Sequence, residues 1–259
     1  MNQPPYNRQD LEGPPMEGPK FLAFLGRERT RKYPEPPPFF QALAKGTLTA
    51  SSLGLWAKNQ YTYWDSDLPF STGAILCKTH DEGVRAQMLK KLVCIEGREI
   101  VNDLNEEWTA PAYEELWLRF GESLGLSREE VTSWNVFSRT HFATSTLRLL
   151  SRWWEWSWLD GLAAMYAADL LARDDYGGAA DPLARAYGVR DEGLVFFTAY
   201  ANDSAEDIAW EEKALSEWCF TRERQLTAAR AFRYRLDIEY QAHLPLHTAA
   251  SGKLPLQVP

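Results

Sequence analysis

Four histidines supply the side chains best suited to proton transfer near neutral pH, because imidazole titrates close to that range. They are His80, His141, His243 and His247. Only His243 and His247 have the i, i+4 spacing that places two metal ligands on one helical face, and we expect this pair to be exposed in the C-terminal segment. His141, in SRTHFATST, is the candidate general base, with a structural helix histidine as the alternative interpretation.

Cysteine usage and charge exclude several classes of function. Cys77, Cys94 and Cys219 are odd in number and form no CxxC pair, which indicates reduced thiols in a cytoplasmic protein. The net charge of -8 offers no basic cluster for phosphates, so we expect no nucleic-acid partner. The opening MNQPPYNRQD lacks the charged and apolar pattern of an export signal, and the apolar runs are too short to span a membrane.

Composition predicts one folded unit with short tails. A hydrophobic content of 45% and eleven tryptophans provide bulky material for a core or for the lining of a cavity. Residues 1–19 are rich in proline and poor in apolar residues, so we expect a disordered N-terminal tail. We expect a single helical domain over residues 20–243 and a C-terminal tail over residues 244–259.

Apolar residues recur at helical spacing along the chain, and no window shows sustained strand alternation. Ser51 or Ser52 is expected to cap a helix that ends between Asp65 and Pro69, and Asp81 to cap the next. SREE, from Ser127, is a capping box. The predicted helices span about 21–25, 39–46, 52–65, 81–95, 113–124, 193–218 and 221–240. Residues 142–171 are expected to form one or two helices, with Gly161 as the place of a kink. The pattern therefore predicts an all-α bundle with a central pocket.

Five segments in order resemble one known group of helical proteins. They are WAKNQYTYW (56–64), GAILCKTHDEGVRAQMLKKL (73–92), EELWLRFGESLGLSREEV (114–131), EEKAL (211–215) and TRERQLTAARAFRYRLDIEY (221–240). Together, over about residues 35–242, they are similar to the PqqC/TenA branch of the haem-oxygenase-like superfamily. The resemblance implies a haem-oxygenase-like seven-helix bundle, which we expect to form a homodimer. It also implies one of two chemistries: cofactorless ring oxidation or oxygen activation at a di-iron site.

The resemblance allows the di-iron possibility to be examined position by position. Such enzymes place a Glu and a His seven residues apart, a Glu after an AxY-like run, and a His-xxx-Asp-xx-His set later. In this chain the first pair is Glu106, or Glu96 in a second alignment, with Tyr113. The middle Glu is replaced by Asp169, and the last set is replaced by Tyr200, Ser204 and Asp207. Every histidine is missing, so we expect no metal. If iron is present, the candidate ligands are Glu106, Asp169 and Asp207.

The pyrroloquinoline-quinone synthesis oxidase on this scaffold holds a polyanionic ring through Arg, Lys, His and Tyr. In this chain Gln60, Trp64 and Ile95 stand where that oxidase has an Arg, a Gln and a His. Lys91 and Arg235 keep the positive charge found at their places, and Tyr63 matches a residue of the oxidase pocket. The pocket is thus less basic and more aromatic. We expect Tyr63, Lys91 and Arg235 to bind a small aromatic substrate, an indole or a phenol, and His141, Asp169 and Tyr200 to act in catalysis.

These observations favour an oxidase-like or oxygenase-like enzyme that acts on a small, amino-acid-derived aromatic metabolite in biosynthesis. We expect no cofactor, with molecular oxygen as a co-substrate. One alternative is a catalytically silent protein that binds a small molecule or a partner. A second is a non-haem di-iron oxidase with a carboxylate-rich site. An enzyme should show convergent polar groups in a closed pocket, whereas a partner protein should show a large exposed apolar patch.

Overall fold

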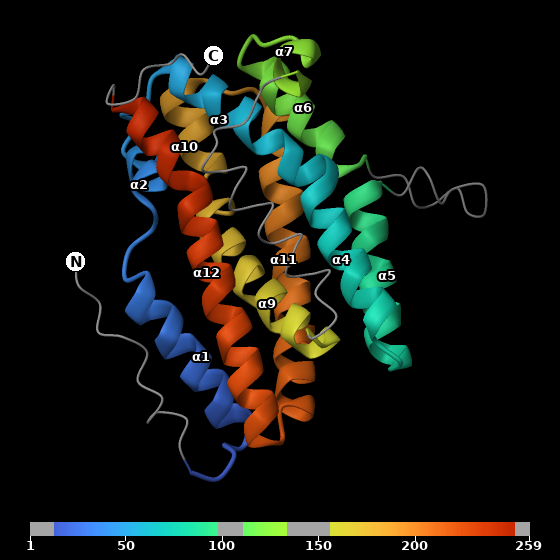
Figure 1. Cartoon of the computed structure of the whole chain (residues 1–259). Coiled ribbons are helices and arrows are strands. Elements are labelled where there is room, and N and C mark those ends of the chain that lie inside the picture. The colour runs from blue at the N-terminus through green and yellow to red at the C-terminus, as the bar shows by residue number, and fades with distance from the viewer. Residues whose placement is uncertain (1–12, 98–110, 134–155, 252–259) are drawn as a thin grey trace, which may run out of the picture.

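The computed structural model describes residues 13–97, 111–133 and 156–251, and every element in these ranges is a helix (Figure 1). The helices are α1 (Gly18–Lys32), α2 (Pro38–Ala44), α3 (Ala50–Thr62), η2 (Tyr63–Asp67), α4 (Leu68–Lys78), α5 (Glu82–Glu96), α6 (Tyr113–Ser123), α7 (Arg128–Thr132), α9 (Trp158–Asp175), α10 (Ala180–Tyr187), α11 (Asp191–Trp218) and α12 (Arg222–Ala250). The all-α prediction is confirmed for these residues. None of these helices has both the length and the apolar composition that crossing a membrane requires.

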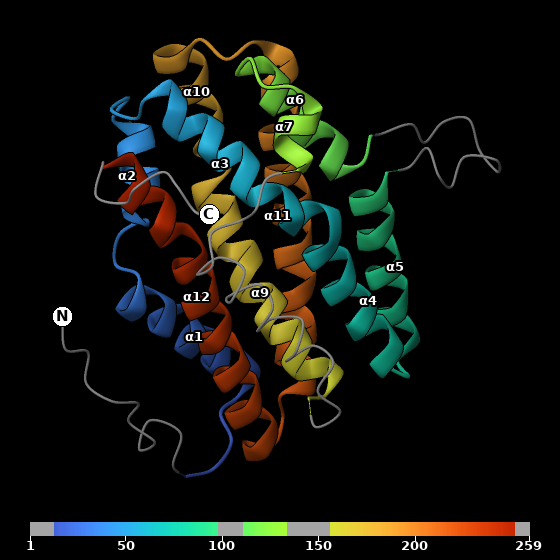
Figure 2. The same cartoon turned by 45° about the horizontal axis from the view of Figure 1, so that its top comes forward.

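Helix α9 forms the centre of the bundle. It packs along both α11 and α12, and Figures 1 and 2 show it lying between them. The helix is buried around most of its circumference, as its apolar composition predicts. A capping box between Ser157 and Asp160 fixes its first turn. Helix α9 continues through Gly161, where a Cβ would lie 2.7 Å from Cγ1 of Ile75, so glycine permits close packing against α4.

The helix predicted to end between Asp65 and Pro69 continues instead. Helix α3 passes through the π-helical turn η2 directly into α4. Pro69 has no backbone N–H for the carbonyl four residues earlier, and a wider turn accommodates the missing hydrogen bond without ending the helix. This turn directs Tyr63 and Trp64 into the interior, where both are buried.

Side-chain caps set the boundaries of the shorter helices. Asp81 caps α5 by accepting from the Val84 amide at 2.8 Å, and Ser127 forms the predicted capping box of α7. The cap of α3 was predicted two or three residues too late. Thr49, rather than Ser51 or Ser52, accepts from the backbone amide of Ser52 at 3.1 Å.

Both ends of the helical region extend beyond the predicted limits. Helix α1 begins at Gly18, within the segment predicted to be a tail, and runs well past its predicted end. Helix α12 was predicted to end near Tyr240 but continues to Ala250, because it buries Leu246 and Ala249 against the bundle. The expected exposure of His243 is therefore wrong: its side chain is buried on α12.

Aromatic side chains fill the space among α3, η2, α6 and α11. Trp56, Trp64 and Trp117 are almost completely buried, and Trp64 packs on Phe196 with ring centroids 4.7 Å apart. The Trp117 indole N–H donates to the carbonyl of Ala57 at 2.8 Å, so this polar atom is satisfied in the core. The described tryptophans of this group are core residues, and Trp64 also lines a cavity of the site described next.

Candidate functional site

A buried lysine joins three helices at the centre of the bundle. The Nζ atom of Lys91, on α5, lies 2.6 Å from Oδ2 of Asp169 on α9 and 2.7 Å from Oδ2 of Asp207 on α11. The side chains of Lys91 and Asp169 are 5% and 1% exposed, and that of Asp207 is 21% exposed. Burial alone would lower the pKa of Lys91, but these two carboxylates raise it above its ordinary value. Lys91 is therefore an ammonium group at neutral pH and cannot act as a nucleophile.

Glu211 adds a third acid to this cluster, one helical turn after Asp207 on α11. Its side chain is completely buried. Burial, followed by the charge of Asp169, raises the pKa of Glu211 well above its ordinary value. Asp169 contacts the ammonium of Lys91 directly, so we assign the negative charge to Asp169 and the proton to Glu211. A neutral acid next to an ionised one can exchange a proton within the site.

A second cluster lies on the neighbouring turns of η2 and α12. The guanidinium of Arg235 donates to the hydroxyl of Tyr63 and pairs with Glu239 one turn later on α12. Burial raises the pKa of Tyr63, so its hydroxyl stays protonated. Tyr63 also interacts electrostatically with Asp169 and Lys91, which shows that the two clusters adjoin.

Tyr200 lies on α11 between the clusters and the aromatic core. Its ring centroid is 4.9 Å from that of Trp64 and 5.3 Å from that of Tyr113. Burial, followed by the charges of Tyr63 and Asp169, raises the pKa of Tyr200 well above its ordinary value. The phenol is thus suited to donating a hydrogen bond or a proton, and it is unsuited to accepting one as a base.

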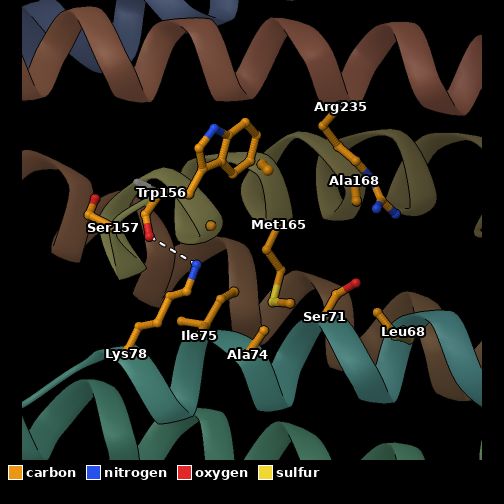
Figure 3. Close-up of a pocket in the computed structure, with 12 residues that line it drawn as sticks. Leu68, Ser71, Ala74, Ile75, Lys78, Trp156, Ser157, Met165, Ala168 and Arg235 are labelled. Carbon is orange, nitrogen blue, oxygen red and sulfur yellow. Dashed lines mark hydrogen bonds between the residues drawn. The ribbon is translucent and has the colours of Figure 1, made fainter. Parts of the chain in front are cut away.

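Two small cavities flank these side chains. The first, of about 30 Å³, lies between α4 and α9 and is lined by Leu68, Ser71, Ala74, Ile75, Lys78, Trp156, Ser157, Gly161, Ala164, Met165, Ala168 and Arg235. Figure 3 shows Lys78 and Arg235 toward opposite ends of this pocket, with Met165 between them. The second, of about 20 Å³, is lined by Tyr33, Pro37, Tyr63, Trp64, Ala168, Leu171, Ala172, Asp175, Tyr176, Tyr200, Glu239, Tyr240 and His243.

The structure brings most of the predicted site residues together. Lys91, Asp169 and Asp207 form one ion cluster, and Tyr63 and Arg235 belong to the adjoining one. Both cations already have acidic partners, so neither ammonium nor guanidinium is held solely for an anionic ligand. His141 and Glu106, with the predicted helix between residues 142 and 155, lie outside the described residues.

Three residues of the site were missed from sequence: Glu211, Glu239 and Lys78. Glu211 lies within EEKAL, which was used only as a marker of the fold, although it follows Asp207 by four residues. Glu239 follows Arg235 by four residues and shares its helical face. This i, i+4 spacing was the sequence signal that could have identified Glu211 and Glu239. Pairs on an exposed helix surface have the same spacing, and only burial in the structure distinguishes the two cases.

Two of the three candidate iron ligands, Asp169 and Asp207, lie against a cation of the protein itself, while the third, Glu106, lies outside the described residues. The ammonium of Lys91 lies against the carboxylates of both Asp169 and Asp207. Within residues 13–97, 111–133 and 156–251, no group of three or more His, Cys, Asp or Glu side chains is placed to hold a metal ion. The positive charge that balances these acids comes from a side chain of the protein itself.

Comparisons with known proteins agree with this architecture. The chain is 26% identical over 203 residues to a pyrroloquinoline-quinone synthase of Cronobacter sakazakii, which covers 78% of this chain and 76% of that protein. It is 24% identical over 217 residues to one of Pseudomonas aeruginosa, covering 82% and 80%.

Solved structures show the same fold at low identity. A Nostoc punctiforme protein described as CADD-like and of unknown function has a TM-score of 0.68 at 14% identity, covering 90% of this chain and 98% of that one. A Shewanella denitrificans domain of unknown function with a haem-oxygenase-like fold has a TM-score of 0.63 at 15% identity, covering 96% and 94%. The predicted haem-oxygenase-like fold is confirmed. Residues 27–223 match the model of the TENA/THI-4/PQQC family, and the chain belongs to that family.

Proposed function

We propose that this protein is an oxidase-like or oxygenase-like enzyme that acts on a small aromatic carboxylate without a metal cofactor. The observation that carries the proposal is the buried cluster of Lys91, Asp169, Asp207 and Glu211. Burying an ion pair costs free energy that apolar packing would not, so such a cluster is weak support for stability. Groups with shifted pKa values gather at functional sites, and here they surround the aromatic centre of the bundle.

Acid–base chemistry is the contribution that these side chains support. Asp169 is the acceptor for a substrate proton, Glu211 stores a proton beside it, and Tyr200 donates to an oxygen on which charge develops. In the oxidase form of the reaction the substrate loses two electrons and two protons. Molecular oxygen accepts both and leaves as hydrogen peroxide, so no further reductant is needed.

The charge of the first cavity supports a ligand with an anionic group. Lys78 and Arg235 line it, and no acid does so among the described residues. Nε of Arg235 is buried and has no hydrogen-bond partner in the described part of the chain. The remaining lining is largely apolar and includes Met165 and Trp156. A carboxylate group near Arg235 matches this lining, and the volume of about 30 Å³ suits a group of that size.

The distribution of exposed apolar residues favours an enzyme over a partner protein. The large apolar side chains that the described surface exposes are Leu89, Val195, Phe220 and Tyr234. They are distributed over α5, α11, the turn before α12, and α12. Single exposed apolar residues of this kind are normal for a globular surface. The polar groups, in contrast, converge in the interior.

The test is oxygen-dependent conversion of aromatic acids. Oxygen uptake, peroxide formation and product mass are measured with indole-3-acetate, 4-hydroxyphenylacetate, indole-3-propionate, tryptophan and tyrosine. Asp169→Asn and His141→Ala should each lower turnover by roughly 10²-fold, the usual effect of losing an acid–base group. Lys90→Ala is the matched control, because Lys90 is on the same helix but forms an exposed pair with Glu206. Equal turnover in Asp169→Asn and in the unaltered protein would contradict the proposal.

A further inference from the structure

The second cavity has the opposite charge to the first. Six aromatic residues line it, namely Tyr33, Tyr63, Trp64, Tyr176, Tyr200 and Tyr240. Asp175 and Glu239 also line it, while no lysine or arginine of the described chain does so. Its volume of about 20 Å³ suits a group the size of one water molecule. Aromatic faces combined with carboxylates are the surroundings that organic ammonium groups prefer.

Asp175 is the acid in this cavity that lacks a partner. It is the last residue of α9 and is only 8% exposed. Among the described residues, none donates a hydrogen bond to its carboxylate or forms an ion pair with it; Arg29 acts on it only at a distance, and that guanidinium is paired with Asp174. A buried carboxylate without a partner is costly, and a cation in the cavity would relieve that cost.

The other charged groups around the cavity do not neutralise Asp175. Glu239 faces the same space, and its negative charge opposes ionisation of Asp175; Glu239 itself is paired with Arg235, which does not line this cavity. His243 is neutral, since burial lowers its pKa. Its Nδ1–H donates to the carbonyl of Glu239 at 2.8 Å, while Nε2 accepts from the hydroxyl of Tyr176 at 3.2 Å.

We propose that this cavity binds the ammonium group of the substrate, with Asp175 as its counter-ion, and that the substrate class is therefore an aromatic compound that carries an ammonium group. Ala168 lines both cavities, so the two adjoin at this part of α9. Lys78 and Arg235 line only the first of them. The proposal rests on the proposed function for the choice of an aromatic ligand, but the ammonium site is tested by binding alone.

Isothermal titration with three ligands that share one ring separates the two charges. Tryptophan carries both groups, tryptamine carries only the ammonium and indole-3-propionate carries only the carboxylate. We expect both ligands with an ammonium group to bind more tightly than indole-3-propionate. Asp175→Asn should weaken tryptophan and tryptamine by about tenfold or more and leave indole-3-propionate unchanged. Asp181→Asn is the matched control, because Asp181 is exposed on α10 and pairs with Arg185; it should change none of the three affinities.

A second measurement uses the head group alone. Methylammonium chloride should raise the melting temperature of the unaltered protein more than potassium chloride of equal ionic strength, and this difference should vanish in Asp175→Asn. Equal binding of tryptamine by Asp175→Asn and the unaltered protein would overturn the site. Amine binding without any oxygen-dependent turnover would refute the enzyme and keep the site. Turnover of indole-3-propionate with no binding of either amine would refute the ammonium site and keep the proposed enzyme.

Discussion

The Nζ atom of Lys91 lies 2.6 Å from Oδ2 of Asp169 in the middle of the bundle, and their side chains are 5% and 1% exposed. The pair joins α5 to α9, and Asp207 extends it to α11. Three helices that are distant in sequence therefore meet at one ammonium group. The arrangement is stable only while the charges balance, because either partner alone would be a buried, uncompensated ion.

Lys91→Met should destabilise the protein by about 3–5 kcal/mol, since it removes the cation and leaves buried acids without compensation. Urea unfolding at neutral pH measures the change in the free energy of unfolding. Lys90→Met is the control. Its pair with Glu206 is exposed, so the expected change is below about 1 kcal/mol. Similar stabilities of the two variants would show that the buried pair does not hold the three helices together.

Purified protein should contain no stoichiometric iron, because the Lys91 ammonium already balances Asp169 and Asp207. Elemental analysis after anaerobic loading with ferrous iron is the measurement. Two tightly bound iron atoms per chain, lost in Asp169→Ala, would restore the di-iron interpretation. The same loading of Lys90→Ala controls for effects of surface charge.

Much of the fold was predictable because it depends on local signals. Asp81 and Ser127 cap helices as their sequence context predicts. The continuation of α3 through η2 was not predictable, since Pro69 usually marks a break and only tertiary packing keeps the helix intact. The extension of α12 to Ala250 likewise depends on what Leu246 contacts, which a short window of sequence does not contain.

The sequence predicted which residues belong to the site better than it predicted how they interact. The resemblance identified Lys91, Asp169 and Asp207 as site residues, but the type and spacing of these residues did not show that they neutralise one another. Asp175 carries no sequence signal at all, since an acid at the end of a helix is ordinarily a solvated residue. Its importance comes from the aromatic rings that several other helices place around it.

Gly161→Ala should destabilise the protein by about 1 kcal/mol or more, despite the better helix propensity of alanine. The added Cβ would lie 2.7 Å from Cγ1 of the buried Ile75, so the Ile75 side chain or the helices that carry the two residues must shift. Gly26→Ala is the matched control. No atom lies within 4 Å of its Cβ on α1, so it should stabilise by about 0.5–1 kcal/mol. Thermal melting of both variants decides whether close packing or helix propensity dominates at residue 161.

The protein should be a homodimer, as its resemblance to the PqqC/TenA branch implies. Light scattering at micromolar concentration measures the mass directly. A value near twice the chain mass of 29.6 kDa is expected. A single species of 29.6 kDa across a tenfold range of concentration would contradict it.

Asp175 should make the protein less stable as the pH rises through the weakly acidic range. Burial, followed by the charge of Glu239, raises the pKa of Asp175 to about 7, whereas an unfolded aspartate titrates near 3.9. Between these values the folded state binds more protons than the unfolded state, so the free energy of unfolding falls with pH and this contribution levels off above pH 7.

Asp175→Asn removes the effect of pH on this contribution to stability. The variant should therefore exceed the unaltered protein in stability at pH 8, by up to about 4 kcal/mol, and the difference should shrink toward pH 5. Urea unfolding at both pH values, with Asp181→Asn as the control, measures this difference. Other buried acids, such as Glu211, are present in both proteins, so a constant difference between pH 5 and pH 8 would mean that Asp175 is already ionised throughout this range.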